Sequence, residues 1–349
     1  MRIQLATYLF ACGVALQVGS SSLAAPVNDR VRLARNSETG EVTDTTPTEI
    51  TLKKGDSPSR KIPVNQIKSI VFDGEPAELS QARVSAVNGA FAKASQLLDK
   101  VDASTIRRDL IKQDVEYLQA FIAAKLAAGG EGEILEAGRK LNAFVKTYPN
   151  SFHNLEASEL MGDLLMMSGR YDPALKQYNE LAKAPWPEYK MRAAVAAGRA
   201  LQAQGKHPEA IQQFDAALAV GDDGPDSQNQ KLAATLGKSI SQAETGNLDD
   251  AVQSIEKIIQ DADPQQKELH ARAYNALGTC YEKANKNKEA LFAFLHVDVL
   301  YNTLPDAHAE ALSHLVPLWK AIGQDERSRE SKELLLQRYP NSRWAKQMQ

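Results

Sequence analysis

The clearest pattern along the chain is the spacing of apolar residues between positions 271 and 305. Four side chains fall at i, i+3, i+4 and i+7, which places them on one face of a helix: Tyr274, Leu277, Gly278 and Tyr281. Asn285 then marks a turn, and the same spacing starts again with Ala290 and Phe294 before Pro305 ends the unit. The segment therefore predicts two helices joined by a tight turn, held close together by the small residues at positions 278 and 290.

The same arrangement recurs on both sides of this segment. Each copy has a turn residue, then a small residue, then an aromatic or aliphatic residue at the spacing of a second helix. The turn residues are 36 to 41 positions apart: Gly132, Gly169, Gly205, Gly246, Asn285 and Gly323. The sequence YPNS at positions 148–151 also returns at positions 339–342. We therefore expect about six helical repeats over residues 118–349.

The unit at 271–305 resembles the tetratricopeptide repeat, whose pattern is W-x₂-L-G-x₂-Y…A-x₃-F…P, with Tyr274 in place of the tryptophan. The resemblance implies a mainly α fold, a right-handed helical-repeat solenoid. The units are longer than the family's repeat of about 34 residues, so we expect enlarged loops between repeats. The unit around Gly246 carries Ser239 and Gln242 where the family has a small residue and a tyrosine. We therefore expect looser packing of its first helix.

The residues before the repeats follow a different pattern. Val31 and Leu33 alternate with polar residues, as do Ile50 and Leu52, and turn residues separate these runs. Residues 25–76 therefore predict a small N-terminal β-module of four or five short strands, of barrel or SH3-like size. Its core should be thin, because Phe72 is its only aromatic residue, so we expect it to dock on the first helices.

Two roles for the β-module remain open at this point. It is either a structural cap for the helical array, which we favour, or a site that captures a peptide along an edge strand. Residues 77–117 are expected to form connecting helices between this module and the repeats.

The first 24 residues have the organisation of a signal peptide. Arg2 precedes an apolar run, and small residues at Ser22 and Ala24 fit cleavage after Ala24. We therefore expect an exported protein in the periplasm or cell envelope, with secretion as a further alternative. An uncleaved anchor is disfavoured because the apolar run is short for a membrane span. The other alternative is a lipoprotein acylated at Cys12, which follows Leu9.

Composition and charge exclude several classes of protein. The net charge is −3, and no basic stripe indicates a nucleic-acid surface. After the leader, Cys280 is the only cysteine, so an intramolecular disulfide is excluded and a buried, inert thiol is expected. We expect no integral membrane span in the mature chain, and oligomeric state is left open.

Signatures of catalysis and of metal or cofactor binding are missing from the sequence. The segment Gly237-Lys238-Ser239 ends like a phosphate-binding loop, but Leu232 stands where its first glycine is required. The histidines form no H-E-x-x-H pattern, and no nucleophile elbow is present. We therefore expect a protein that is not an enzyme and has no cofactor or metal site.

The resemblance to tetratricopeptide repeats implies a concave groove lined by the first helix of each repeat, which holds a segment of a partner protein. The positions that this implies as partner-binding are Arg192, Arg199, Arg272, Asn275 and Glu282. Because Arg presents a planar fork to carboxylates, the arginines suggest an acidic or C-terminal carboxylate ligand. The alternative is that Glu156 and Glu159 simply pair with Arg192 and Arg199 on neighbouring helices.

These observations predict a non-enzymatic exported scaffold that binds a protein or peptide partner in the cell envelope. One alternative is a structural assembly factor of an envelope complex, anchored by the β-module or, in a lipoprotein version, by a lipid. An enzyme with its site in the β-module is the remaining alternative, and no residue set there supports it.

Overall fold

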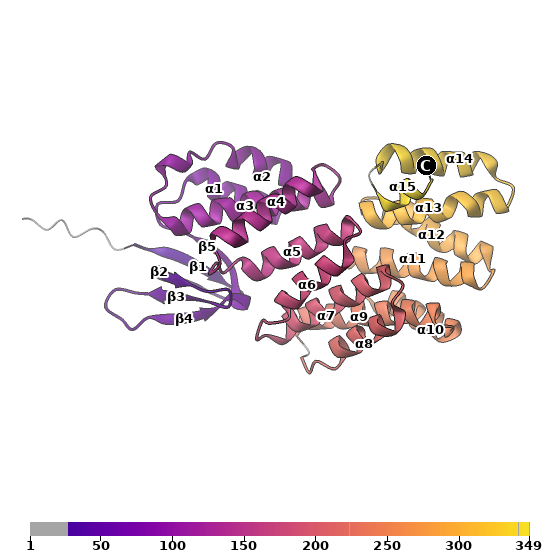
Figure 1. Cartoon of the computed structure of the whole chain (residues 1–349), viewed down its shortest axis with the longest axis horizontal. Coiled ribbons are helices and arrows are strands. Elements are labelled where there is room, and N and C mark those ends of the chain that lie inside the picture. Colours follow the sequence, from indigo (N-terminus) through magenta and orange to yellow (C-terminus); the bar gives the residue numbers. More distant parts are fainter. Residues whose placement is uncertain (1–26, 223, 341, 349) are drawn as a thin grey trace, which may run out of the picture.

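The structure is a computed structural model that describes residues 27–222, 224–340 and 342–348. Within these residues a five-stranded antiparallel sheet is followed by fifteen α-helices, which leave the sheet as a curved array (Figure 1). The expected mainly α repeat fold with an N-terminal β-module is therefore confirmed. The predicted signal peptide, residues 1–24, and Cys12 lie outside the described residues.

The sheet is built from five short strands, β1 (Asp29–Leu33), β2 (Ser37–Thr45), β3 (Glu49–Lys53), β4 (Arg60–Pro63) and β5 (Ile67–Val71). Their order is β4-β3-β2-β1-β5, so the consecutive strands β4 and β5 lie at opposite edges. The short helical turn 64–66 joins them. Such a connection reaches about 14 Å, whereas the edges of a flat five-stranded sheet are about 19 Å apart. The sheet must therefore curl towards a barrel.

The β-module shares its hydrophobic core with the first helices. Its inward residues, Val31, Ile50 and Ile70 among them, are buried together with Leu79 and Val115 from the helices, in one continuous cluster. This is the physical consequence of a thin sheet core, because 50 residues with one aromatic side chain bury too little apolar surface alone.

A fully buried carboxylate, Asp29, anchors this junction. The backbone N–H groups of Val42 and Asp73 donate hydrogen bonds to Asp29 Oδ2 and Oδ1, each at 2.8 Å. The Arg108 guanidinium adds a two-nitrogen fork at 2.6 and 2.8 Å. Burial by itself raises the pKa of Asp29, but Arg108 and the two backbone donors outweigh it and lower that pKa below its ordinary value.

The helices follow one another as antiparallel pairs. Their bounds are α1 (Ala77–Val87), α2 (Phe91–Leu98), α3 (Asp109–Ala128), α4 (Ile134–Thr147), α5 (Asn154–Met167), α6 (Tyr171–Leu181), α7 (Pro187–Ala203), α8 (His207–Leu218), α9 (Pro225–Glu244), α10 (Leu248–Asp261), α11 (Lys267–Lys283), α12 (Asn287–Leu300), α13 (Pro305–Ala321), α14 (Asp325–Arg338) and α15 (Arg343–Met348). The expected start of the repeats at residue 118 falls inside α3, which runs unbroken. In the described residues the pairing already begins with α1 and α2.

The predicted turn residues close the helix pairs, with one exception. Asn285 has φ 59° and is the one non-glycine residue in the left-handed region among those described, at the position that glycine holds in the neighbouring turns. Asn tolerates this conformation better than other side chains. In the first unit, Gly130 rather than Gly132 has a positive φ. The loop between α3 and α4 is longer than the loops within the later helix pairs. The turn therefore lies upstream of the position expected from the spacing.

Aromatic side chains of second helices pack against glycines of first helices. A Cβ added at Gly278 would lie 2.7 Å from Phe294 Cε2, and one at Gly198 would lie 2.6 Å from Phe214 Cε1. Phe214 also packs closely against Gly237 on α9, so this ring contacts glycines of two successive first helices. The unit that departs most from the repeat pattern therefore has a closely packed glycine two positions before Ser239, in contact with the preceding unit.

Two further expectations concern the thiol of Cys280 and the presence of a membrane-spanning helix. Cys280 is buried, and burial raises the pKa of its thiol to about 11, which disfavours the reactive thiolate. Among the helices that the structure describes, none combines the length and the apolar character that crossing a membrane requires.

Candidate partner-binding groove

The first helices of four successive pairs, α5, α7, α9 and α11, line one open cavity of about 460 Å³. The residues that form its charged lining are Glu159, Asp163, Arg192, Arg199, Lys267, Glu268 and Arg272. Val195, Ala196 and Ala233 supply apolar wall. The cavity, which we call the groove, therefore brings together three of the five residues predicted to bind a partner.

Arg192 is held by a neighbouring helix. Its Nε donates to Glu159 Oε1 at 3.1 Å, and its terminal nitrogen contacts the second carboxylate oxygen. The guanidinium carbon also lies 4.9 Å from the centre of the Tyr189 ring. For Arg192, the structure therefore has the helix-to-helix pairing that was the alternative to ligand binding.

Arg199 and Arg272 are placed differently. Both are half-buried, and among the described residues neither makes an ion pair within 4.0 Å or a side-chain hydrogen bond. Arg199 Nε is buried without a hydrogen-bond partner. Since a buried guanidinium donor normally has a partner, these two side chains leave donors available to a ligand.

The electrostatic environment of this pair is unfavourable to both cations. Burial lowers the pKa of Arg272, and the positive charge of Arg199 lowers it further, whereas Glu268 acts in the opposite direction. Burial also lowers the pKa of Arg199, again against the effect of Glu268. An anion placed between the two guanidinium groups would relieve both effects.

Two carboxylates near the arginines have raised pKa values, the exposed Asp163 and the half-buried Glu310. Desolvation raises the pKa of Asp163, although the Tyr178 hydroxyl donates a 2.9 Å hydrogen bond to its Oδ1. Desolvation also raises the pKa of Glu310, with a further contribution from Asp306. Both shifts are in the direction that favours the neutral acid.

The remaining two predicted residues are occupied by contacts to the next helix, α13. The side-chain amide of Asn275 donates to Ala307 O at 2.9 Å and to Glu310 Oε2 at 3.1 Å. Glu282 Oε2 lies 2.7 Å from His314 Nδ1. Both residues lie on α11 outside the lining of the groove, and both connect successive repeats.

The groove also contains residues that the sequence alone did not identify. Glu268 precedes Arg272 by four positions and so shares its helix face, a spacing that could have indicated it. Asn229 and Gln230 come from α9. The repeat that contains α9 departs most from the family pattern, so the sequence did not indicate which residues of this helix face the groove. In the residues that the structure describes, no cluster of His, Cys, Asp and Glu is arranged to hold a metal ion.

Comparisons with known proteins agree with this fold. A tetratricopeptide repeat family model matches residues 159–227, 195–267 and 236–296. No curated protein matches the chain. A solved tetratricopeptide repeat protein from Parabacteroides merdae is 18% identical with a TM-score of 0.56, over 78% of this chain and 95% of that one. The apo form of the quorum sensor NprR from B. thuringiensis is 14% identical with a TM-score of 0.57, over 75% of each chain. At these identities the likeness concerns the fold alone.

Proposed function

We propose that this chain, which carries tetratricopeptide repeats between residues 159 and 296, is a non-enzymatic scaffold that holds a segment of a partner protein in the groove. A carboxylate of that segment, from an acidic side chain or the C-terminus, lies between Arg199 and Arg272. The observation that carries the proposal is the pair of arginines without an ion-pair partner among the described residues, in one open cavity.

The chemistry of the groove favours a carboxylate over a neutral group. Each guanidinium offers parallel N–H donors that match the two oxygens of a carboxylate. A carboxylate between Arg199 and Arg272 would satisfy the buried Nε donor and offset the repulsion between the two cations. The apolar wall beside them, at Val195 and Ala196, can cover the aliphatic part of the same segment.

The β-module supports the array in this proposal rather than binding a partner. Thr45 Oγ1 donates to Asn150 O at 3.0 Å, and Asn65 Nδ2 donates to Glu188 Oε1 at 2.7 Å. These bonds join the sheet to the loop before α5 and to α7, in addition to the shared core. Such a junction fits a structural cap, and it would also serve an assembly factor whose module is fixed to its repeats.

The binding experiment uses two pools of fluorescein-labelled octapeptides, one rich in Asp and Glu with free C-termini and one neutral with amidated C-termini. We expect the wild-type chain to bind the acidic pool preferentially. Replacing both arginines, Arg199→Gln with Arg272→Gln, should weaken that binding about tenfold or more, because it removes charge-assisted hydrogen bonds. Fluorescence anisotropy measures the affinity.

The matched control removes the same charge from exposed positions on α4 and α14, Arg139→Gln with Arg329→Gln. We expect the control to bind like the wild type. Because neither Arg199 nor Arg272 makes an ion pair among the described residues, the groove variant should keep the melting temperature of the wild type. Equal affinity of both variants for the acidic pool, or no binding of that pool by the wild type, would overturn the proposal.

We also propose that the chain is exported and acts in the cell envelope, on the basis of the leader pattern in residues 1–24. The protein isolated from its native cell should then begin at Ala25, which mass spectrometry of the intact N-terminus determines. A chain that retains Met1 would contradict export with cleavage, and a lipid-modified N-terminal Cys12 would replace it with membrane anchoring.

A further inference from the structure

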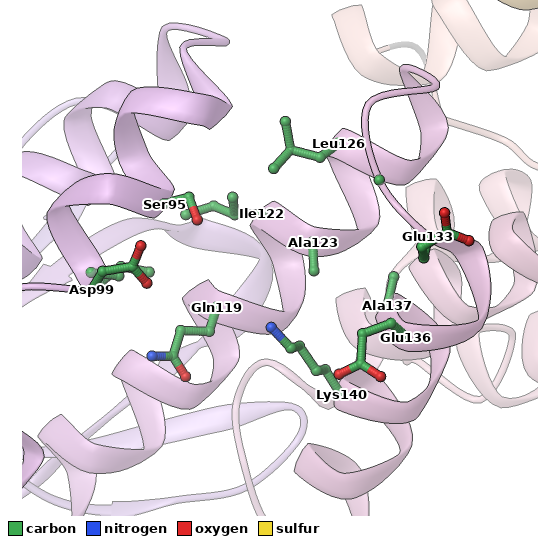
Figure 2. A pocket seen from close by; sticks show the side chains of 12 residues that line it. Ser95, Asp99, Gln119, Ile122, Ala123, Leu126, Glu133, Glu136, Ala137 and Lys140 are labelled. Atoms are coloured by element: carbon green, nitrogen blue, oxygen red, sulfur yellow. The ribbon is translucent and has the colours of Figure 1, made fainter.

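A second cavity, of about 350 Å³, lies outside the groove, between α2, α3 and α4. Figure 2 shows α2 with Ser95 and Asp99 on one side, α4 with Glu136 and Lys140 on the other, and α3 between them. The α2 helix has eight residues and α4 has fourteen. We call this cavity the α2–α4 pocket.

The floor of the α2–α4 pocket is apolar. It consists of side chains from all three helices: Leu98, Ile122, Ala123, Leu126 and Ala137. Leu98, Ile122 and Ala137 are buried, whereas Ala123 and Leu126 are half-buried and supply the accessible apolar surface. The floor can therefore cover an aliphatic chain of several carbons.

The rim of the same pocket is acidic. Asp99, Glu133 and Glu136 face one basic side chain, Lys140. Glu136 lies 3.6 Å from Arg139, and both of these side chains are well exposed. Among the described residues, neither Asp99 nor Glu133 makes an ion pair within 4.0 Å. The rim therefore carries more negative than positive charge.

The position of Asp99 distinguishes the pocket from an ordinary acidic helix start. Glu133 and Glu136 stand at the N-terminus of α4, where the helix dipole favours negative charge, so their presence there needs no ligand. Asp99 stands at the C-terminal end of α2, where the dipole disfavours it. A cation beside Asp99 would be stabilised by the carboxylate and by the helix end together.

We propose that the α2–α4 pocket binds an arginine or lysine side chain of a partner protein. The aliphatic stem lies on Ala123 and Leu126, and the charged head lies at the acidic rim, to which Asp99 and Glu133 contribute from opposite sides of α3. Only these two residue types join a stem of three or four methylene groups to a permanent positive charge. The pocket is separate from the groove, so it provides a second contact of opposite charge preference on the same chain.

The experiment uses fluorescein-labelled octapeptides that alternate Arg or Lys with Leu, and a matched pool in which glutamine replaces every basic residue. We expect the wild-type chain to bind the basic pool and not the matched pool. Asp99→Asn with Glu133→Gln should weaken binding roughly fivefold, the size of a partly exposed charge contact. Ala123→Phe fills the floor without changing charge, and it should weaken binding as well.

The control removes two exposed acids elsewhere, Asp56→Asn with Glu330→Gln, and we expect it to bind the basic pool like the wild type. Equal loss in the control and the pocket variant would show that overall charge attracts the peptides, and would overturn the proposal. So would unchanged binding by Ala123→Phe, or no binding of the basic pool at all. Affinity for the acidic pool reports on the groove separately, because the pocket variants leave Arg199 and Arg272 intact.

Discussion

Arg108→Met lowers the free energy of unfolding of the N-terminal part of the chain by about 3 kcal/mol or more, because it leaves a buried charge without its partner. Asp29 is fully buried, and Arg108 supplies two of its four hydrogen bonds. Methionine replaces the aliphatic part of the arginine side chain without its charge, so the loss of the charged guanidinium dominates. Urea denaturation followed by far-UV circular dichroism measures the change.

The neighbouring arginine provides the control for this variant. Arg107 is exposed and makes no ion pair among the described residues, so Arg107→Met should change the stability little. The pH dependence gives a second test. Because the folded pKa of Asp29 is below its ordinary value of 3.8, its contribution is present above that pH and is lost as pH falls through the folded pKa. The wild type should lose stability in this acid range, and a variant Arg108→Met that loses as much would contradict the assignment.

Gly237→Ala destabilises the protein by about 1–3 kcal/mol, although alanine is the better helix former. A Cβ at this position would overlap the Phe214 ring, which is fully buried and already packs closely against Gly198 on α7. The ring therefore cannot move aside without opening the contact between α7 and α9. Thermal unfolding of the variant measures the cost.

Gly138 on α4 provides the opposite case with the same substitution. An added Cβ there would meet only Met161 Sδ, at 4.0 Å, so Gly138→Ala should stabilise the helix by about 0.5–1 kcal/mol. The two variants differ only in what surrounds the new methyl group. A gain of stability in both variants would mean that the Phe214 ring is not tightly packed against Gly237.

The repeat fold could be predicted from the sequence because each unit is specified locally. The spacing of Gly278, Ala290 and Phe294 indicates a helix pair without knowledge of any distant residue, and the structure places these residues in the contact expected of them. The same holds for the alternation of Val31 and Leu33 in the sheet. The helices expected between residues 77 and 117 include α1 and α2, and α3 crosses the expected start of the repeats at residue 118.

The contacts that hold the parts together could not be predicted in this way. Asp29 and Arg108 are 79 positions apart, and neither belongs to a repeated pattern. Within the groove, the sequence identified the helix face that carries the arginines. It could not show that Arg192 is paired with Glu159 while Arg199 and Arg272 are not, because pairing depends on the distances between neighbouring helices.

The placement of Arg199 and Arg272 on different helices has a mechanical consequence. Arg199 lies on α7 and Arg272 on α11, with α9 between them, so the site spans three successive first helices. In a repeat array each unit contacts only its neighbours, and small rotations between units add up to large changes in curvature. A carboxylate held by both guanidinium groups would therefore restrict rotation between these three helices. A bound partner would make the solenoid stiffer as well as fill the groove.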